Sequence, residues 1–145
     1  MEIFFDTNVL VAASEWSHPH YAQAWPAMSR VVKGQDKGFM SAHSIAEVFA
    51  ALTRLPVRPR IHAMEAVRII NDNILPHFEV VAVDQRDYVD VLETMASGGW
   101  MGAKIYDAVL LACAAKCRAK RIYTFNLADF RDLAPEDLQG KICSP

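Results

Sequence analysis

The feature that most limits the fold of this sequence is a regular alternation of short β-prone segments with longer helical ones. Residues 2–5, 39–41, 78–83 and 121–125 are short, largely apolar segments that contain Phe, Ile, Val or Tyr, as buried strands do. The stretches between them carry apolar residues at helical spacing. This alternation predicts an α/β fold with three layers, α/β/α, around a mostly parallel central sheet.

The helices are predicted from this spacing together with capping and breaking residues. Asp84 is placed to cap one helix and Pro56 to stop another, while Pro26 interrupts a third stretch that is otherwise helical. We expect a polar turn over 34–38 and a flexible glycine loop over 97–102. The predicted helices cover residues 9–13, 21–32, 44–55, 58–75, 85–96 and 106–118, with a last one from 127 to about 135.

Length and composition set the class of protein. The 145 residues suit one domain over 1–145, and we see no internal repeat or linker. A net charge of −2 argues mildly against a nucleic-acid binder, although overall charge does not report local patches. Three cysteines without disulfide spacing and the absence of a long apolar run predict a cytoplasmic protein that does not enter the membrane.

Four acidic residues stand in apolar surroundings on separate predicted elements. Asp6 ends a strand, Glu47 and Asp107 lie in strongly apolar helices, and Asp129 follows a strand. Sites in such sheets form beyond the carboxyl ends of the strands, where these acids are expected to meet. Carboxylates that lie close together repel unless protons or cations lie between them, and hard oxygen ligands suit Mg²⁺ or Mn²⁺.

Each acid also has a purely structural explanation. Asp6 is placed to cap a helix, Asp129 to lie in a surface loop, and Asp107 to interact with a helix dipole or with Lys104. Taken singly, these alternatives stay open.

Glu47 is harder to explain as a structural residue. An unpaired carboxylate on an apolar helix is costly unless it is protonated, binds metal or forms a salt bridge, for which Arg54 is a candidate. Four such acids together favour a metal site more strongly than any one of them does.

Four segments resemble the motifs of PIN-domain nucleases, especially toxins of the VapC type. They are Phe5–Leu10, Ser41–Glu47, Asp107–Ala108 and Thr124–Phe130. Their order, spacing and apolar surroundings agree with that family over roughly residues 2–133.

The resemblance implies a metal-binding and catalytic quartet of Asp6, Glu47, Asp107 and Asp129, with Mg²⁺ or Mn²⁺ as cofactor. Some relatives carry an acid at the position of Asn126, so Asn126 and Asp129 remain alternatives for the fourth place. The supporting polar groups that the resemblance implies are Thr7, Asn8, Thr124 and Asn126.

The same resemblance implies a function. The expected activity is that of a metal-dependent endoribonuclease that hydrolyses RNA phosphodiester bonds and acts as the toxin of a toxin-antitoxin pair. The implied partners are RNA, a cognate antitoxin protein and a second copy of the chain in a homodimer. Alternatives are an RNA-processing nuclease without a toxin role and an inert binding module of the same fold. A haloacid-dehalogenase-type phosphohydrolase would need a second Asp where Asn8 stands.

Other candidate residues have weaker support. Glu15, His18 and His20 make a poor zinc-ligand set, and Cys113 and Cys117 suit a helical core better than a metal site.

Aromatic and basic residues suggest contacts to RNA. Trp100 is placed either to stack on a base or to act as a hydrophobic anchor. Two basic groups are candidates for phosphate contacts, with solvated surface as the alternative. They are Arg54, Arg58 and Arg60 in the first group and Lys116, Arg118, Lys120 and Arg121 in the second.

Overall fold

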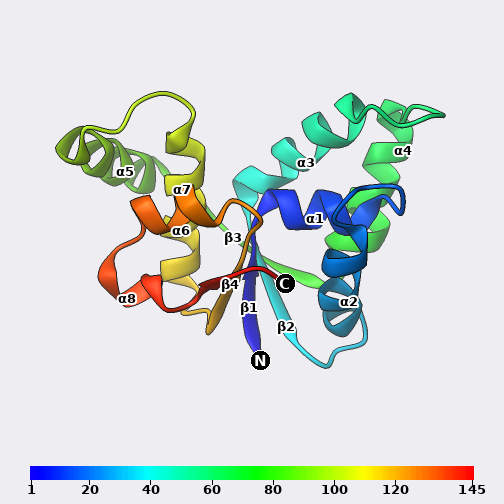
Figure 1. The fold of residues 1–145 in the computed structure, drawn as a ribbon, viewed down its shortest axis with the longest axis horizontal. Coiled ribbons are helices and arrows are strands. Elements are labelled where there is room, and N and C mark those ends of the chain that lie inside the picture. Colours follow the sequence, from blue (N-terminus) through cyan, green and yellow to red (C-terminus); the bar gives the residue numbers. More distant parts are fainter.

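A five-stranded sheet forms the centre of the computed structural model, which describes residues 1–145 (Figure 1). All of its strand pairs are parallel, in the order β3-β2-β1-β4-β5. The strands are β1 (Glu2–Phe5), β2 (Lys37–Ser41), β3 (Phe78–Val81), β4 (Arg121–Tyr123) and β5 (Ile142–Cys143).

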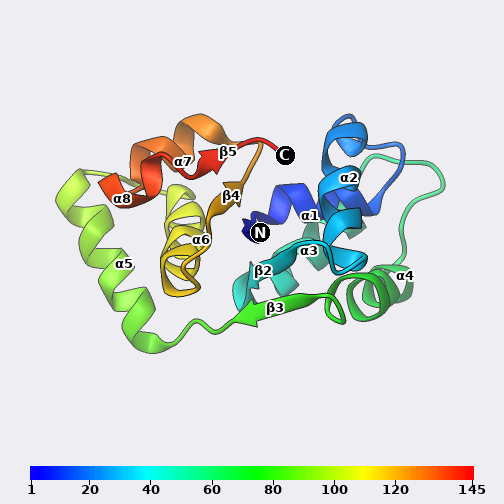
Figure 2. The ribbon, with the colours of Figure 1, turned by 90° about the horizontal axis from the view of Figure 1, so that it is seen from below.

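Helices cover both faces of the sheet, which confirms the three-layer α/β/α fold predicted from the sequence. Figures 1 and 2 show α1 to α4 on one side of the sheet and α5 to α8 on the other. The helices are α1 (Thr7–Ser14), α2 (Tyr21–Val32), α3 (Ala42–Arg54), α4 (Ala63–Arg68), η1 (Ile69–Ile74), α5 (Gln85–Gly98), α6 (Lys104–Lys116), α7 (Leu127–Leu133) and α8 (Glu136–Gln139).

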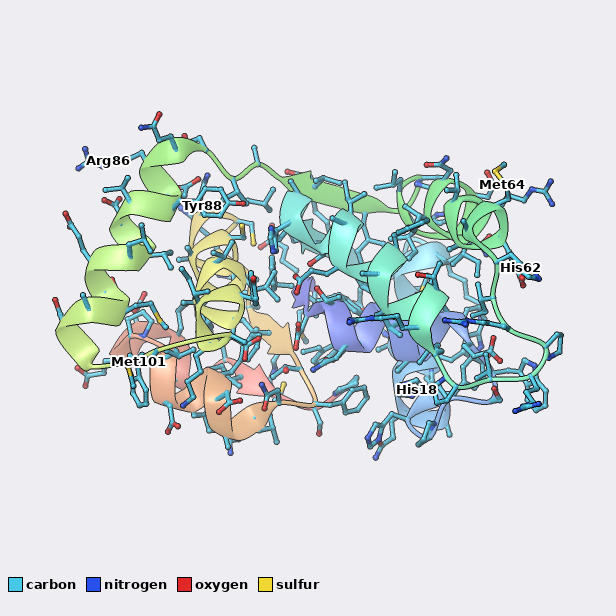
Figure 3. All side chains as sticks on the ribbon, turned by 90° about the horizontal axis from the view of Figure 1, so that it is seen from above. His18, His62, Met64, Arg86, Tyr88 and Met101 are labelled. Atoms are coloured by element: carbon cyan, nitrogen blue, oxygen red, sulfur yellow. The ribbon has the colours of Figure 1, made fainter.

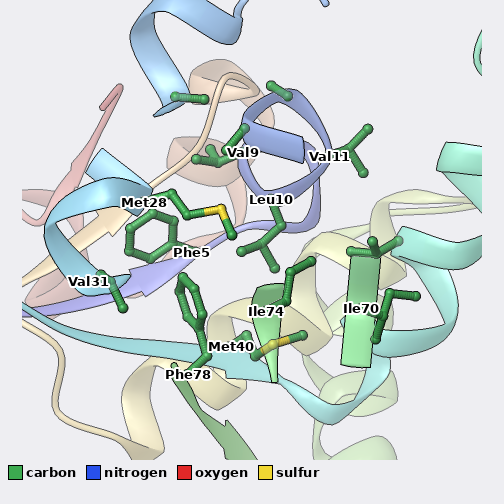
Figure 4. Packing of buried hydrophobic residues seen from close by; sticks show 14 of the residues in the cluster. Phe5, Val9, Leu10, Val11, Met28, Val31, Met40, Ile70, Ile74 and Phe78 are labelled. Atoms are coloured by element: carbon green, nitrogen blue, oxygen red, sulfur yellow. The ribbon is translucent and has the colours of Figure 1, made fainter. Parts of the chain in front are cut away.

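The alternation of side chains along β1 explains why there are two main cores. Ile3 and Phe5 point into the core beneath α1 and α2, whereas Phe4 points into the core beneath α6 and α7. In the first core the Phe5 and Phe78 rings meet edge to face, with centroids 5.0 Å apart (Figure 4). Burial on both faces fixes the β1 register, and with it the end of the strand at Phe5, directly before Asp6.

The helix predicted over 58–75 is wrong in its first part. Residues 55–62 are irregular, and the helix starts at Ala63 and continues as the π-helical η1. Pro56 and Pro59 explain the difference, because a residue that precedes a proline is disfavoured in helical conformation. By contrast, α2 runs through Pro26 without a break.

Smaller differences concern the ends of elements. The turn predicted to reach residue 38 ends earlier, since β2 begins at Lys37. The predicted strands 78–83 and 121–125 each end two residues sooner, at Val81 and Tyr123. The short α8 and β5 were not predicted, because four- and two-residue elements carry too little periodicity to detect. No helix is both long and apolar enough to cross a bilayer.

Candidate functional site

All four predicted acids lie at the carboxyl-end side of the sheet. Asp6 follows β1 directly, Glu47 lies in α3 after β2, and Asp129 lies in the first turn of α7 after β4. Asp107 joins them from the first turn of α6. Figure 3 looks down on this side of the molecule, where α1 and α3 face α6 and α7. The parallel topology therefore gathers acids that are up to 123 residues apart in sequence (129 − 6).

Asp6 is the most deeply buried of the four, with 3% of its surface exposed. It stands at the N-cap position of α1, but its side chain makes no capping hydrogen bond. Instead, Oδ2 accepts a 2.7 Å hydrogen bond from Thr124 Oγ1. The pKa of Asp6 is raised to about 7, mainly by burial; the charges of Asp107 and Glu47 also raise it, whereas the hydrogen bond from Thr124 lowers it. The structure thus contradicts the interpretation of Asp6 as a simple helix cap.

Thr124 ties two turns of the site together. Its Oγ1, which donates to Asp6, also accepts from the backbone N–H of Asn126 at 2.9 Å. Asn8 Nδ2 lies 3.5 Å from the same oxygen, and Asn8 Oδ1 accepts from the backbone N–H of Phe125 at 3.2 Å. The turn after β1 is therefore locked to the turn after β4. Three of the predicted supporting residues, Asn8, Thr124 and Asn126, belong to this network.

Asn126 connects Asp107 with Asp129. Its Nδ2 donates to Asp107 Oδ2 at 2.8 Å and to Asp129 Oδ2 at 2.9 Å. The pKa of Asp107 rises to about 6 through burial, followed by the charge of Asp129, whereas the hydrogen bond from Asn126 lowers the pKa of Asp129. Asn126 and Asp129 thus both lie beside Asp107, so the geometry leaves both as candidates for the fourth place.

Lys104 does not pair with Asp107, contrary to the structural alternative considered from sequence. Its Nζ lies 3.4 Å from Asp129 Oδ1 and 3.2 Å from Asp132 Oδ2. Lys104 is therefore a positive group at the rim of the site, beside Asp129 and not beside the acid that the sequence suggested.

Glu47 is less buried than its apolar helix suggested, with 29% of its side chain exposed. Its Oε1 accepts from Thr7 Oγ1 at 3.1 Å and lies 3.9 Å from His43 Nε2. Arg54 does not form the salt bridge considered from sequence, because its Nε donates to the carbonyl of Ala50. Glu47 instead reaches the site, where its charge raises the pKa of both Asp6 and Asp107.

A cavity of about 390 Å³, the acid cavity, opens among Asp6, Glu47 and Asp107. His18, His20 and Phe125 also line this cavity. No local pattern predicts this, because only the tertiary structure brings the 15–20 loop to the end of β4. His18 and His20 are thus beside the acids, while Glu15 turns to accept from Ser17.

The donor chemistry of the site fits a divalent cation. Its carboxylate and amide oxygens are hard ligands, and carboxylates whose pKa is raised by burial and by one another need positive charge to ionise together. In the arrangement described here no three acidic, His or Cys side chains form a ready metal-ligand set. Asn126 and Lys104 contact the oxygens of Asp107 and Asp129, so a cation would compete with them.

The structure gives Trp100, Cys113 and Lys116 contacts that are structural. Trp100 packs against the Val91–Met95 side of α5 and under Lys104 Nζ, which supports the hydrophobic anchor. Cys113 is a buried core residue. In the second basic group Lys116 is neutralised by Asp87 at 2.7 Å.

The first basic group has no carboxylate partner. Arg54, Arg58 and Arg60 are exposed and line a cavity of about 530 Å³ that shares Leu55 with the acid cavity. None of the three arginines forms a salt bridge.

Comparison with known proteins gives one family and several structures. Residues 3–135 match the model of the PIN domain family. Comparison with curated proteins gives no match.

Among solved structures, VapC20 of Mycobacterium tuberculosis, described as a Sarcin-Ricin loop cleaving toxin, is 18% identical with a TM-score of 0.66, over 88% of this chain and 92% of its own. VapBC2 of Rickettsia felis, bound to promoter DNA, is 16% identical with a TM-score of 0.61, over 92% and 96%. FitAcB of Neisseria gonorrhoeae is 18% identical with a TM-score of 0.63, over 90% and 92%. At these identities the likeness establishes the fold.

Proposed function

Because this chain belongs to the PIN-domain family, we propose that it is a metal-dependent endoribonuclease and the toxin of a toxin-antitoxin pair. The observation that carries the proposal is the meeting of four carboxylates: three of them line one cavity, and Asn126 links the fourth to Asp107. Charges within this cluster raise the pKa of Asp6 and of Asp107. An inert binding module of this fold has no use for such a cluster, which destabilises a fold when it lacks cations. The four residues are Asp6, Glu47, Asp107 and Asp129.

We assign the metal-binding role to these acids, and the role of orienting them to their hydrogen-bond donors. Thr124 holds Asp6, Thr7 holds Glu47, and Asn126 sets the spacing of the remaining two. Bound Mg²⁺ or Mn²⁺ would activate water and stabilise charge on the phosphate and the departing oxygen of RNA. Aligned carboxylates reduce the reorganisation that this chemistry requires.

We further propose a cognate antitoxin protein and a homodimer as assemblies. The mycobacterial neighbour is described as a Sarcin-Ricin loop cleaving toxin, and another neighbour is VapBC2 bound to a DNA fragment from its promoter. Trp16 and Trp25 are exposed and line a pocket of about 380 Å³ with further hydrophobic residues, which supports contact with a protein. The antitoxin should place a basic side chain, such as Arg, among the acids, because this neutralises them as a cation does.

The direct test of the activity is RNA cleavage with and without metal. We expect purified protein to cleave structured RNAs, including transfer and ribosomal RNA, in Mg²⁺ or Mn²⁺ and to stop in excess chelator. Gel analysis of the fragments, with metal restored after chelation, checks this. Cleavage that survives chelation would contradict the metal mechanism.

The cavity lined by Arg54, Arg58 and Arg60, here the arginine cavity, should bind the RNA backbone. Changing Arg54, Arg58 and Arg60 together to Gln should weaken binding of single-stranded RNA and reduce the slope of log K against log salt by about 0.7 per lost phosphate contact. Binding titrations at several salt concentrations measure this slope.

The matched control changes Arg118, Lys120 and Arg121 to Gln, with the same loss of charge. These residues lie near the amino end of β4, whereas the acids lie beyond its carboxyl end. An equal effect from both triple variants would mean that overall charge, and not the arginine cavity, attracts RNA.

A further inference from the structure

The acid cavity has an aromatic wall. Phe125 and His20 both line it, and their rings are stacked with centroids 4.4 Å apart and an interplanar angle of 17°. They come from distant parts of the chain, the turn after β4 and the loop before α2. Asp6 and Asp107 line the same cavity, so this stack lies beside the groups proposed to act on a phosphodiester.

The Phe125 ring of the stack is held by residues of the site. Phe125 lies between Thr124, which donates to Asp6, and Asn126, which donates to Asp107. Its backbone N–H donates to Asn8 Oδ1, and its ring packs against the core beneath α1. The hydrogen bonds that hold the acids therefore also position the backbone of Phe125.

The His20 ring of the stack is held in place by hydrogen bonds but is open to solvent. The backbone N–H of His20 donates to His18 Nδ1 at 3.1 Å, and His20 Nδ1 is 3.2 Å from Gln23 Oε1. His20 is exposed to solvent even though Phe125 stacks on one face of its ring. The His18 ring, centred 5.9 Å away and tilted by 40°, is not stacked on the His20 ring.

We propose that the His20–Phe125 stack is a base-binding platform, which holds the nucleobase of a nucleotide adjacent to the phosphodiester at the acid cavity. The inference rests on the proposed ribonuclease function. A flat, pre-positioned ring beside a phosphate site matches a nucleobase, because single-stranded RNA is bound by stacking its bases on aromatic and His side chains. Stacking accepts any base, so the platform contributes affinity and position more than sequence choice.

The test uses binding of two short oligoribonucleotides, octa-adenylate and an abasic octamer with the same phosphates. Fluorescence anisotropy is measured with protein carrying Glu47→Gln, which keeps both oligonucleotides intact. We expect this protein to bind octa-adenylate about five- to a hundredfold more tightly than the abasic octamer. Adding His20→Ala should remove most of that ratio, and His20→Phe should restore it because a flat ring returns.

Trp16→Ala is the matched control, since Trp16 is an exposed aromatic residue four positions away that lines a different cavity. It should leave the ratio unchanged. Loss of the ratio in Trp16→Ala to the same extent, or a ratio that survives His20→Ala, would overturn the platform. Thermal melting of each variant separates this result from loss of the fold, which would lower the affinity for both oligonucleotides together.

Cleavage of RNA by the wild-type chain distinguishes the two proposals. If metal-dependent cleavage occurs but the Glu47→Gln protein binds the intact and abasic octamers equally, or neither, only the platform fails. If the wild type cleaves no RNA and binds neither octamer, the platform fails together with the proposed function. If the ratio and its dependence on His20 are found without cleavage, the platform stands and the nuclease activity fails.

Discussion

Asp6→Asn should reduce metal-dependent RNA cleavage by about 10²–10³-fold or more, while making the metal-free protein more stable at pH 8. The loss of activity follows from removing one of the charges proposed to hold the cation, which costs at least as much as removing one preorganised electrostatic group. Asn keeps the shape of Asp and an oxygen that accepts from Thr124 Oγ1. Cleavage rates at saturating RNA measure the effect.

The direction of the stability change follows from the pKa of Asp6. Its pKa is about 7 in the fold and near 3.8 in the unfolded chain, so the folded form binds more protons between these values. Stability from this group is present below about pH 4 and is lost as pH rises to about 7. The difference in unfolding free energy between Asp6→Asn and wild type should therefore grow by an amount on the order of 3 kcal/mol from pH 4 to pH 8.

Chemical denaturation at several pH values in excess chelator measures this difference. Asp72→Asn is the matched control, because Asp72 is an exposed acid in η1 with no ion pair in the structure. It should change neither cleavage nor the pH dependence. A variant at Asp6 that cleaves as fast as wild type would remove this residue from the centre.

The proposed toxin role predicts that Asp6→Asn also changes the growth of a bacterial host. Induced in a bacterial host that contains the RNA target, the wild-type chain should arrest growth, and Asp6→Asn should not. Co-expression of the cognate antitoxin should restore growth of the wild type. Arrest by Asp6→Asn at equal protein level would show that toxicity does not come from cleavage.

Asp107→Asn should remove most of the stabilisation that Mg²⁺ gives the wild type. At about tenfold its dissociation constant, Mg²⁺ should stabilise the wild type by about 1.4 kcal/mol, a shift of roughly 3–6 °C in melting temperature. Burial and the charge of Asp129 raise the pKa of Asp107 to about 6, so its carboxylate destabilises the metal-free fold above that pH. Without metal, the variant should melt at or above the wild type at pH 8.

Differential scanning calorimetry with and without Mg²⁺ measures both effects. Asn accepts the Asn126 Nδ2 hydrogen bond as Asp does, so the loss of charge is the main change. An equal Mg²⁺ shift in both proteins, or none in either at high Mg²⁺, would exclude Asp107 from metal binding. Asp132→Asn is a useful control, because Asp132 is an acid that shares Lys104 with Asp129 but lies outside the acid cavity.

The sequence by itself determined the order of the elements and the parallel sheet. Residues 2–5 carry their strand signal locally, in apolar residues buried on both faces, and residues 78–81 carry it in the β-prone Phe and Val of an edge strand. The sequence also placed Asp6 and Asp129 after strands. Because sites form at the carboxyl ends of parallel strands, this placement predicted that both acids lie on the same side of the sheet. The helix over 58–75 failed where Pro56 and Pro59 override the apolar spacing.

Only the tertiary structure decided which side chains surround the acids. Lys104 could have paired with Asp107 three positions away, but it lies beside Asp129 and Asp132, which are brought to it by the packing of α7 on α6. His20 meets Phe125 across more than a hundred residues, and Asn126 bridges two acids from different helices. Contacts of this kind depend on the distance between elements in space, for which local propensity and periodicity carry no information.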